Sequence, residues 1–172
     1  MELWDLFDRS GNIVSTNHGR GDTIPEGTYH KIVNIIVQHV DGDYLLMKRS
    51  DDKESRAGEY ELTAGGSTIK GEDFSEGAWR ELYEETGIKA DALYELTPVI
   101  IREEIRYLQK SFFCLTNIDK NSIQLQAGET QGFQWLSEDE VLAISNTDSL
   151  VRLTNEVIER MKEIKLKHFK LT

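Results

Sequence analysis

The stretch Gly66–Ile88 reads GSTIKGEDFSEGAWRELYEETGI and combines a glycine-containing start with residues at helical spacing. We predict a helix over about residues 73–86. Gly87 follows it, and glycine there favours the left-handed backbone that ends many helices. Gly65 and Gly66 come just before, where the absence of a side chain lets the backbone approach a ligand or a metal closely. The stretch therefore predicts a loop and a helix that form a site together.

Three carboxylates share one face of this predicted helix. With about 100° per residue, Glu81, Glu84 and Glu85 lie in one sector, and Arg80 can neutralise only one of the three charges. We expect the opposite face to pack on a sheet. Its members are Ser75, Trp79, Leu82 and Thr86.

The crowded carboxylates have two interpretations. A divalent cation such as Mg²⁺ or Mn²⁺ would relieve their repulsion, because hard cations prefer carboxylate and water oxygens. Alternatively, they form an ordinary solvated acidic face, as is common in a chain with a net charge of −11. The neighbouring Gly65, Gly66 and Glu72 favour the metal site.

The rest of the chain predicts a mixed sheet flanked by helices. The β-branched run 32–37 is typical of a strand buried on both faces, and Asp41-Gly42 predicts a hairpin to a strand at 44–47. Further strands are expected at 3–7 and 13–15 (a hairpin), 60–63, 93–101, 105–116 and 132–136. Ser137 begins a short capped helix, and an amphipathic helix follows from residue 148. We predict an α/β fold with one domain over 1–172, including an N-terminal hairpin and lead-in (1–30) and a C-terminal helix (148–172).

The composition limits the possible partners and the compartment. The chain has 172 residues with 20 Lys+Arg against 31 Asp+Glu, so a general basic face for nucleic acid is not expected. Cys114 is the only cysteine, which excludes an internal disulfide, and we expect it in the core. The sequence shows neither a signal peptide nor an apolar stretch long enough to span a bilayer, so it predicts a cytoplasmic protein without membrane contact.

The spacing of the fixed positions carries a family resemblance. Gly66 is followed by five residues, Glu72, seven residues, Arg80-Glu81-Leu82, one residue, Glu84-Glu85, one residue and Gly87-Ile88. This pattern resembles the complete Nudix box. The resemblance implies an α/β/α sandwich and Mg²⁺-dependent cleavage of the diphosphate linkage in a nucleoside diphosphate derivative or similar small molecule.

The resemblance also implies roles for individual residues. Glu81, Glu84 and Glu85 match the metal-binding carboxylates, and Gly65 matches a residue whose backbone carbonyl contacts the metal. Glu72 and Arg80 match positions that orient the catalytic loop and helix.

A further acidic residue often lies on a later loop in this family, as a metal ligand or base. Glu129 resembles it, with a solvated loop glutamate as the alternative, and Glu103 and Glu104 are competing candidates. A divalent ion would lower the pKa of a bound water, and Glu84, Glu85 or Glu129 would accept its proton.

A narrower resemblance concerns the branch of the family. Trp4-Asp5-Leu6-Phe7-Asp8, Tyr29-His30-Lys31 and Lys48-Arg49-Ser50 are similar to the isopentenyl-diphosphate isomerase-like branch. The positions of the isomerase's catalytic cysteine and metal-binding histidine hold Gly65 and Ser67, so hydrolysis is the better prediction. An isomerase and a non-catalytic binding module are the alternatives, and a homodimer is expected from the family.

The residues that contact the substrate are less clearly marked. Arg20, His30, Lys48 and Arg49 are candidates to face the diphosphate, and each has a solvated or structural role as the alternative. Trp79 and Trp135 could stack on a base, although packing in the core is the favoured interpretation of both.

Overall fold

The β-branched run at 32–37 forms the middle of β3 (His30–His39), a central strand of an eight-stranded mixed sheet. The computed structural model describes residues 2–53, 56–145 and 153–169. Strand β3 pairs parallel with β9 (Tyr107–Thr116) and antiparallel with β6 (Thr63–Ser67). Its side chains alternate between the two faces of the sheet. Val33, Ile35 and Val37 enter one core cluster and Ile36 enters the other, so the predicted burial on both faces is confirmed.

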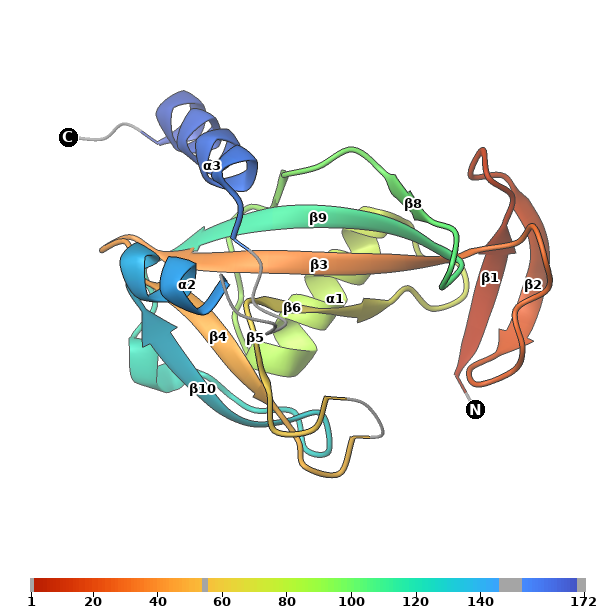
Figure 1. Ribbon diagram of the computed structural model, residues 1–172, viewed down its shortest axis with the longest axis horizontal. Coiled ribbons are helices and arrows are strands. Elements are labelled where there is room, and N and C mark those ends of the chain that lie inside the picture. Colours follow the sequence, from red (N-terminus) through yellow and green to blue (C-terminus); the bar gives the residue numbers. More distant parts are fainter. Residues whose placement is uncertain (1, 54–55, 146–152, 170–172) are drawn as a thin grey trace.

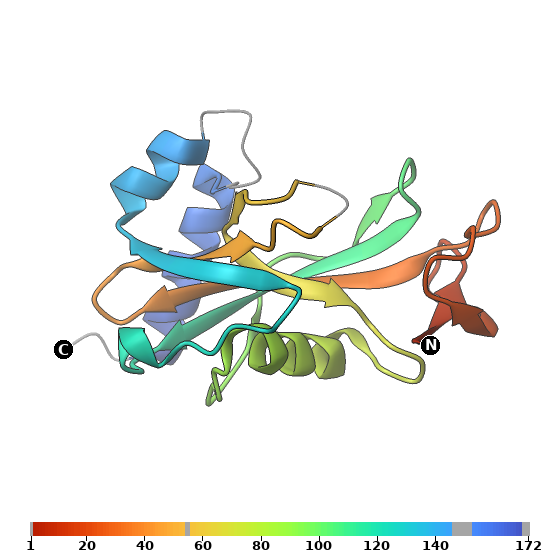
Figure 2. The ribbon, with the colours of Figure 1, turned by 90° about the horizontal axis from the view of Figure 1, so that it is seen from below.

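Helices cover both faces of the sheet. Figure 2 shows α1 (Phe74–Thr86) on one face, and α2 (Glu138–Ser145) and α3 (Asn155–His168) on the other. Leu82 of α1 packs with Val33 and Phe112 in the first core, and Met161 of α3 packs with Phe113 in the second. The predicted α/β/α sandwich is confirmed.

The remaining strands complete the order β10-β4-β3-β9-β7. They are β4 (Tyr44–Arg49), β5 (Tyr60–Glu61), β7 (Tyr94–Glu95), β8 (Ile100–Arg102) and β10 (Thr130–Leu136). Strand β5 pairs with β4, and β8 pairs with β9. A 3-10 turn, η1 (Lys120–Ser122), precedes β10.

Strands β3 and β4 separate soon after the turn that joins them. The turn at Asp41-Gly42 forms as predicted, but Gln38↔Tyr44 is the one pair in register between the two strands. Beyond that pair, the same edge of β4 pairs with β5, while its other edge pairs with β10. The predicted hairpin therefore forms, but its ladder is short. Beyond the turn the two strands diverge, and β6, which pairs with β3, lies between them (Figure 1).

Three other predicted elements have different bounds. The strand expected at 93–101 is divided into β7 and β8 by Pro98, which has no N–H for a ladder. The strand expected from 105 begins at Tyr107, because residues 103–106 form a turn in which Arg106 has φ 56°. The C-terminal helix begins at Asn155 with Thr154 as its N-cap, and the predicted start at residue 148 lies outside the described residues.

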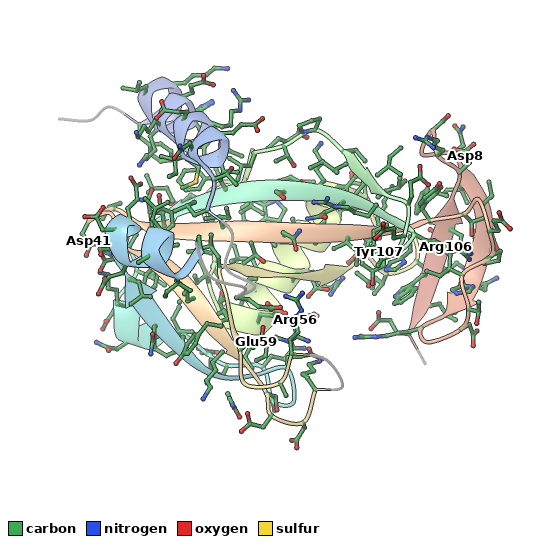
Figure 3. All side chains as sticks on the ribbon, viewed as in Figure 1. Asp8, Asp41, Arg56, Glu59, Arg106 and Tyr107 are labelled. Atoms are coloured by element: carbon green, nitrogen blue, oxygen red, sulfur yellow. The ribbon has the colours of Figure 1, made fainter. Side chains whose placement is uncertain are left out.

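The N-terminal hairpin supports the loop that precedes α1. The predicted hairpin forms: strands β1 (Leu3–Phe7) and β2 (Ile13–Gly19) make a separate two-stranded sheet, and β2 extends beyond the strand expected at 13–15. Asp8, labelled in Figure 3, closes its turn by accepting the N–H of Asn12 at 2.9 Å. The Lys70 N–H donates to the Leu3 carbonyl, and the Gly71 N–H donates to Asp5 Oδ2, each at 2.8 Å. The lead-in is thus part of the frame of the site.

Candidate active site

Helix α1 begins and ends where its sequence predicts. Asp73 is the N-cap and accepts the Glu76 N–H at 2.8 Å, while Glu76 Oε2 accepts the Asp73 N–H at 2.9 Å. This reciprocal capping box satisfies two backbone donors at the helix start. Gly87 has φ 72° and donates its N–H to the Tyr83 carbonyl at 2.8 Å. The helix is therefore fixed at both ends of the Nudix-type spacing.

The buried face of α1 differs from the predicted one. Leu82 and Thr86 are buried as expected, but Ser75 is exposed and Trp79 is 38% exposed. The other buried positions are Gly77 and Ala78, which flank Glu81 on the helix surface at about 100° per residue. The carboxylates therefore border the buried face instead of opposing it. A Cβ at Gly77 would meet Thr68 Cγ2 at 2.7 Å, so the absence of a side chain permits this close packing.

Arg80 joins three carboxylates. Its Nε lies 2.7 Å from Glu72 Oε1, and its Nη1 lies 2.8 Å from Glu81 Oε1 and 2.9 Å from Glu84 Oε2. Its Nη2 donates to the Ser67 carbonyl at 2.9 Å, and Glu72 Oε2 accepts the Ile69 N–H at 2.9 Å. One guanidinium thus holds the loop and the helix together while sharing a single positive charge among three anions.

Glu85 is the carboxylate with the most unusual environment. Its Oε2 accepts the Gly65 N–H at 3.0 Å, and no Lys or Arg of the described residues forms an ion pair with it. Dense surrounding protein removes its hydration, and the negative charges of Glu81, Glu61 and Glu129 add to this effect. Together they raise the pKa of Glu85 to about 8.

The two glycines before the helix leave room for these contacts. A Cβ on Gly65 would lie 2.1 Å from the Val33 carbonyl oxygen, so β6 could not pair with β3 in this way. A Cβ on Gly66 would lie 2.8 Å from Glu81 Oε1. The backbone at Gly65 and Gly66 can therefore lie close to the carboxylates of Glu85 and Glu81.

Charged residues from β5 and from the loop before β10 lie near Glu85, since the charges of Glu61 and Glu129 act on it. Glu129 forms an ion pair with Lys53, and Arg49 Nη1 lies 2.9 Å from Glu61 Oε1. Burial raises the pKa of Glu61, and the positive charges of Arg49, Arg56 and Lys53 partly offset this increase. Figure 3 shows Arg56 beside β5 and β6, with Glu59 next to it.

Glu61, Lys53 and Arg56 are the residues that the sequence reasoning missed. The segment from residue 50 to 58 reads only as a polar loop, and Glu61 lies in a two-residue strand with no spacing signal. The run of charges at residues 51–56 was the one available indication.

A divalent cation requires several oxygen ligands around one point. Among the described residues, no three acidic, histidine or cysteine side chains converge on one point. Arg80 holds Glu81 and Glu84, while Glu85 is directed at the Gly65 N–H. The donor types nevertheless fit a divalent cation, because Glu81, Glu84 and Glu85 supply carboxylate oxygens and Glu85 is desolvated with no cationic partner among the described residues. The solvated-face alternative describes Glu84, whose side chain is 41% exposed, but not Glu81, whose side chain is only 12% exposed.

The predicted substrate residues lie in different places. Arg49 belongs to the site through Glu61. Lys48 follows Met47 on β4 and so projects to the other face of the sheet. Arg20 is exposed and pairs with Glu2 at 3.0 Å. Burial raises the pKa of Glu81, and the charges of Glu84 and Glu2 add a smaller increase.

Other candidates have structural roles. Glu103 lies in the turn before β9, where Tyr29 donates to it at 2.5 Å and Arg9 pairs with it, and Glu104 is exposed in the same turn. The structure does not bring either residue to α1. Trp135 packs against the core as predicted, whereas the prediction for Trp79 is wrong.

His30 lies in the interior and not on a substrate surface. It is 2% exposed, stacks on Trp4 at 4.2 Å between ring centroids, and meets the edge of Tyr107 at 4.5 Å. Its Nδ1 has no hydrogen-bond partner among the described residues. Burial lowers the pKa of His30 to about 4, so the ring is neutral at physiological pH. His30 therefore has a structural role, which was the alternative to contact with the substrate.

We expect His30→Phe to remove part of the acid sensitivity of folding. The unfolded chain protonates His30 near pH 6.5 and the folded chain only near pH 4, so His30 stabilises the fold above pH 6.5 and loses this contribution as the pH falls. The loss is about 2 kcal/mol at pH 5. Urea unfolding at pH 7.5 and pH 5 should show a smaller decrease for His30→Phe than for the wild type. His168→Phe, at an exposed position, should retain the wild-type decrease, and an equal decrease in all three proteins would contradict the assignment.

Comparison with known proteins agrees with this geometry. Residues 28–157 match the NUDIX domain family. The chain belongs to the Nudix family. As a member of this family of hydrolases, it is an enzyme that acts on pyrophosphate bonds.

Individual Nudix relatives cover most of the chain. An uncharacterized Nudix hydrolase of Listeria monocytogenes is 26% identical over 151 residues, which covers 88% of this chain and 89% of the relative. A crystal structure of a Deinococcus radiodurans protein has a TM-score of 0.71 at 17% identity, covering 94% of this chain and 98% of that one. The NUDIX domain of NrtR from Shewanella oneidensis, in complex with ADP ribose, has a TM-score of 0.56 at 13% identity, covering 87% and 92%.

The described helices also bear on membrane contact. None of those within residues 2–53, 56–145 and 153–169 is long and apolar enough to cross a membrane.

Proposed function

We propose that this Nudix enzyme hydrolyses the diphosphate linkage of a nucleoside diphosphate derivative or similar organic pyrophosphate, with Mg²⁺, or Mn²⁺ in its place. The desolvated Glu85 carboxylate beside Gly65, without a cationic partner in the described residues, carries this proposal. A divalent cation would provide the missing positive charge. The ADP ribose named with the NrtR domain is consistent with this class of substrate.

The residues that would hold the cation come from α1, from β6 and from the loop before β10. They are Glu81, Glu84, Glu85, the Gly65 carbonyl and Glu129. When bound, the cation would neutralise charge on the diphosphate and lower the pKa of a bound water. Glu72 and Arg80 would keep the loop and helix in place, since Arg80 contacts both.

Side chains of this chain would accept the proton of the attacking water and bind the diphosphate. Glu85 is our first candidate to accept the proton of the attacking water, because its raised pKa brings it near the working pH of a general base. Glu84 and Glu129 are the alternatives. Arg49, Lys53 and Arg56 would attract and orient the anionic diphosphate in a chain whose overall charge repels it.

The two alternatives have less support. Isomerase chemistry would need a thiol at the site, whereas Cys114 is fully buried and burial raises its pKa to about 12. The resemblance to the isomerase-like branch therefore concerns the scaffold in this proposal, and not the reaction. A non-catalytic module is less consistent with an intact set of box carboxylates.

We expect a panel of substrates to separate these functions. Nucleotide sugars, dinucleoside polyphosphates, nucleoside triphosphates and isopentenyl diphosphate would be incubated with Mg²⁺, with Mn²⁺ and with excess chelator. Chromatography should show cleavage of at least one nucleoside diphosphate derivative with metal, none with chelator, and no isomerised isopentenyl product. Nucleotide binding without any cleavage would support the non-catalytic module and contradict our proposal.

The assembly and location of the enzyme are further proposals. We propose a homodimer from the family resemblance and a cytoplasmic location from the sequence. Sedimentation of the purified protein would test the first, and fractionation of cells expressing it would test the second.

A further inference from the structure

A pocket of about 290 Å³ lies at the end of the sheet that adjoins the β1–β2 hairpin in Figure 1. Its walls come from the β1–β2 turn, β3, the start of α1, β8 and β9. The residues that matter here are Arg9, Lys31, Phe74, Val99, Ile101 and Leu108. Its volume suits a small organic molecule. We call this feature the Lys31 pocket.

Three neighbouring strands place the side chains of the pocket side by side. Lys31 lies opposite Leu108 across the β3–β9 ladder, and Leu108 lies opposite Ile101 across the β8–β9 ladder. Lys31 is two residues before Val33, which packs in the core with α1, so the alternation along β3 places Lys31 on the α1 face. Phe74, the first residue of α1, packs in one cluster with Leu108 and Ile101. Regular structure therefore builds a largely apolar wall around one lysine.

The ammonium group of Lys31 has no anionic partner in the described part of the chain. Its Nζ lies 4.0 Å from the centroid of the Phe7 ring and 5.0 Å from that of Phe74, and it makes no ion pair or hydrogen bond there. Aromatic faces attract a cation but do not replace an oxygen acceptor. Burial lowers the pKa of Lys31, and the charges of Asp73 and Asp5 offset only part of this decrease. A bound anion would relieve the cost of this burial.

The other cations around the pocket already have partners. Arg9 pairs with Glu103 at 2.5 Å. Lys110, whose Nζ lies 6.0 Å from the Phe74 ring centroid, pairs with Glu95 at 2.5 Å. Lys31 therefore offers one unmatched positive charge, with two aspartates nearby whose charges act on it. This favours a ligand with a single negative charge over a doubly charged phosphate ester.

We infer that the Lys31 pocket binds a small monocarboxylate with an apolar or aromatic body. The carboxylate would accept hydrogen bonds from the Lys31 ammonium, and the body would displace water from Val99, Ile101 and Leu108. Because Phe74 forms part of the wall, the bound molecule would brace the first turn of α1.

The Lys31 pocket is separate from the carboxylate site. With a rise of about 1.5 Å per residue, Glu81 is about 10 Å and Glu85 about 16 Å along α1 from Phe74. The inference therefore goes beyond the proposed function and does not depend on it.

The test measures binding by the full chain in excess chelator, so that no metal ion contributes. The probes are benzoate and hexanoate, with benzyl alcohol as the neutral analogue and inorganic phosphate as an anion without an apolar body. Calorimetry should show that at least one carboxylate binds about tenfold or more tightly than either control. In NMR spectra of isotope-labelled isoleucine methyl groups, it should shift Ile101 but not Ile164, which is buried under α3.

Lys31→Met is the decisive variant, since methionine keeps the unbranched apolar stem and removes the charge. The ammonium has no ion pair to lose among the described residues, so the variant should fold as the wild type does, and a thermal melt checks this. Its affinity for the carboxylate should fall about tenfold or more. The matched control is Lys89→Met. Lys89 also lies over an aromatic ring, 5.6 Å from the Tyr83 centroid, but is exposed and outside the pocket, so this variant should retain wild-type affinity.

Several outcomes would overturn the inference. They are no saturable binding of either carboxylate, equal binding of benzyl alcohol or phosphate, and unchanged carboxylate affinity in Lys31→Met. Without added carboxylate, Lys31→Met should hydrolyse the best substrate of the panel with wild-type KM and kcat. A raised KM would make the pocket part of the substrate site and would also overturn the inference. Absence of hydrolysis in every protein, including the wild type, would contradict the proposed function and leave the carboxylate pocket standing.

Discussion

Glu85→Gln is expected to lower Mg²⁺-dependent turnover by about 10²–10⁴-fold, the range for loss of a general base. Glutamine keeps the shape of the side chain and can still accept the Gly65 N–H, but it cannot take a proton from water. Steady-state hydrolysis of the best substrate from the panel measures the effect. The matched control is Glu26→Gln, an exposed loop glutamate, which should retain full turnover.

Although it lowers turnover, the same variant should raise the thermal stability of the metal-free protein at high pH. In the metal-free wild type, the folded chain holds the Glu85 proton up to about pH 8, whereas the unfolded chain releases it near pH 4.5. Stability linked to this proton is present below pH 4.5 and is lost as the pH rises toward 8. In excess chelator, Glu85→Gln should therefore melt at a higher temperature than the wild type at pH 9, with a smaller difference at pH 5. Full turnover in Glu85→Gln would show that another residue is the base.

Arg80→Met is expected to lower the free energy of unfolding by about 3–5 kcal/mol, because it leaves partly buried carboxylates without their cation. The side chains of Glu72 and Glu81 are only 15% and 12% exposed, so water replaces the lost contacts poorly. Turnover should also fall by about 10–100-fold, as for residues that orient metal ligands. Chemical denaturation in chelator measures the stability change.

Two further measurements make this prediction specific. Mg²⁺ should restore part of the stability of Arg80→Met, because it would supply positive charge to Glu81 and Glu84. Arg160→Met removes an exposed ion pair with Glu163 on α3 and should cost less than about 1 kcal/mol. If Arg80→Met were as stable as Arg160→Met, the carboxylates would not depend on Arg80.

Local signals in the sequence were sufficient for the helix of the site. The cap at Asp73, the end at Gly87 and the shared face of the carboxylates all follow from residues within a few positions of one another. How the carboxylate face is oriented relative to the buried face of the helix could not be predicted from such local signals. It depends on Gly77 packing against Thr68 and on Ala78 packing in the core, which are tertiary contacts.

Long-range features escaped the sequence for a similar reason. Strand β4 leaves β3 after one residue pair because that edge of β4 pairs with β5, while β3 pairs with β6 over residues 32–36. The pairing of β5 with β4 places Glu61 opposite Met47, where its charge acts on Glu85. A two-residue strand and a polar loop carry no sequence signal that predicts such a position. His30 shows the same limitation, since Trp4 and Tyr107 from distant segments enclose it.

The separation of β3 and β4 also affects how this enzyme could diversify. The loop between β4 and β5 (residues 50–59) lies outside the β3–β6 ladder that holds Gly65. Insertions in this loop would therefore alter the charged surroundings of Glu61 without changing the backbone pairing beneath Glu85. New substrates could be accommodated at low cost in folding.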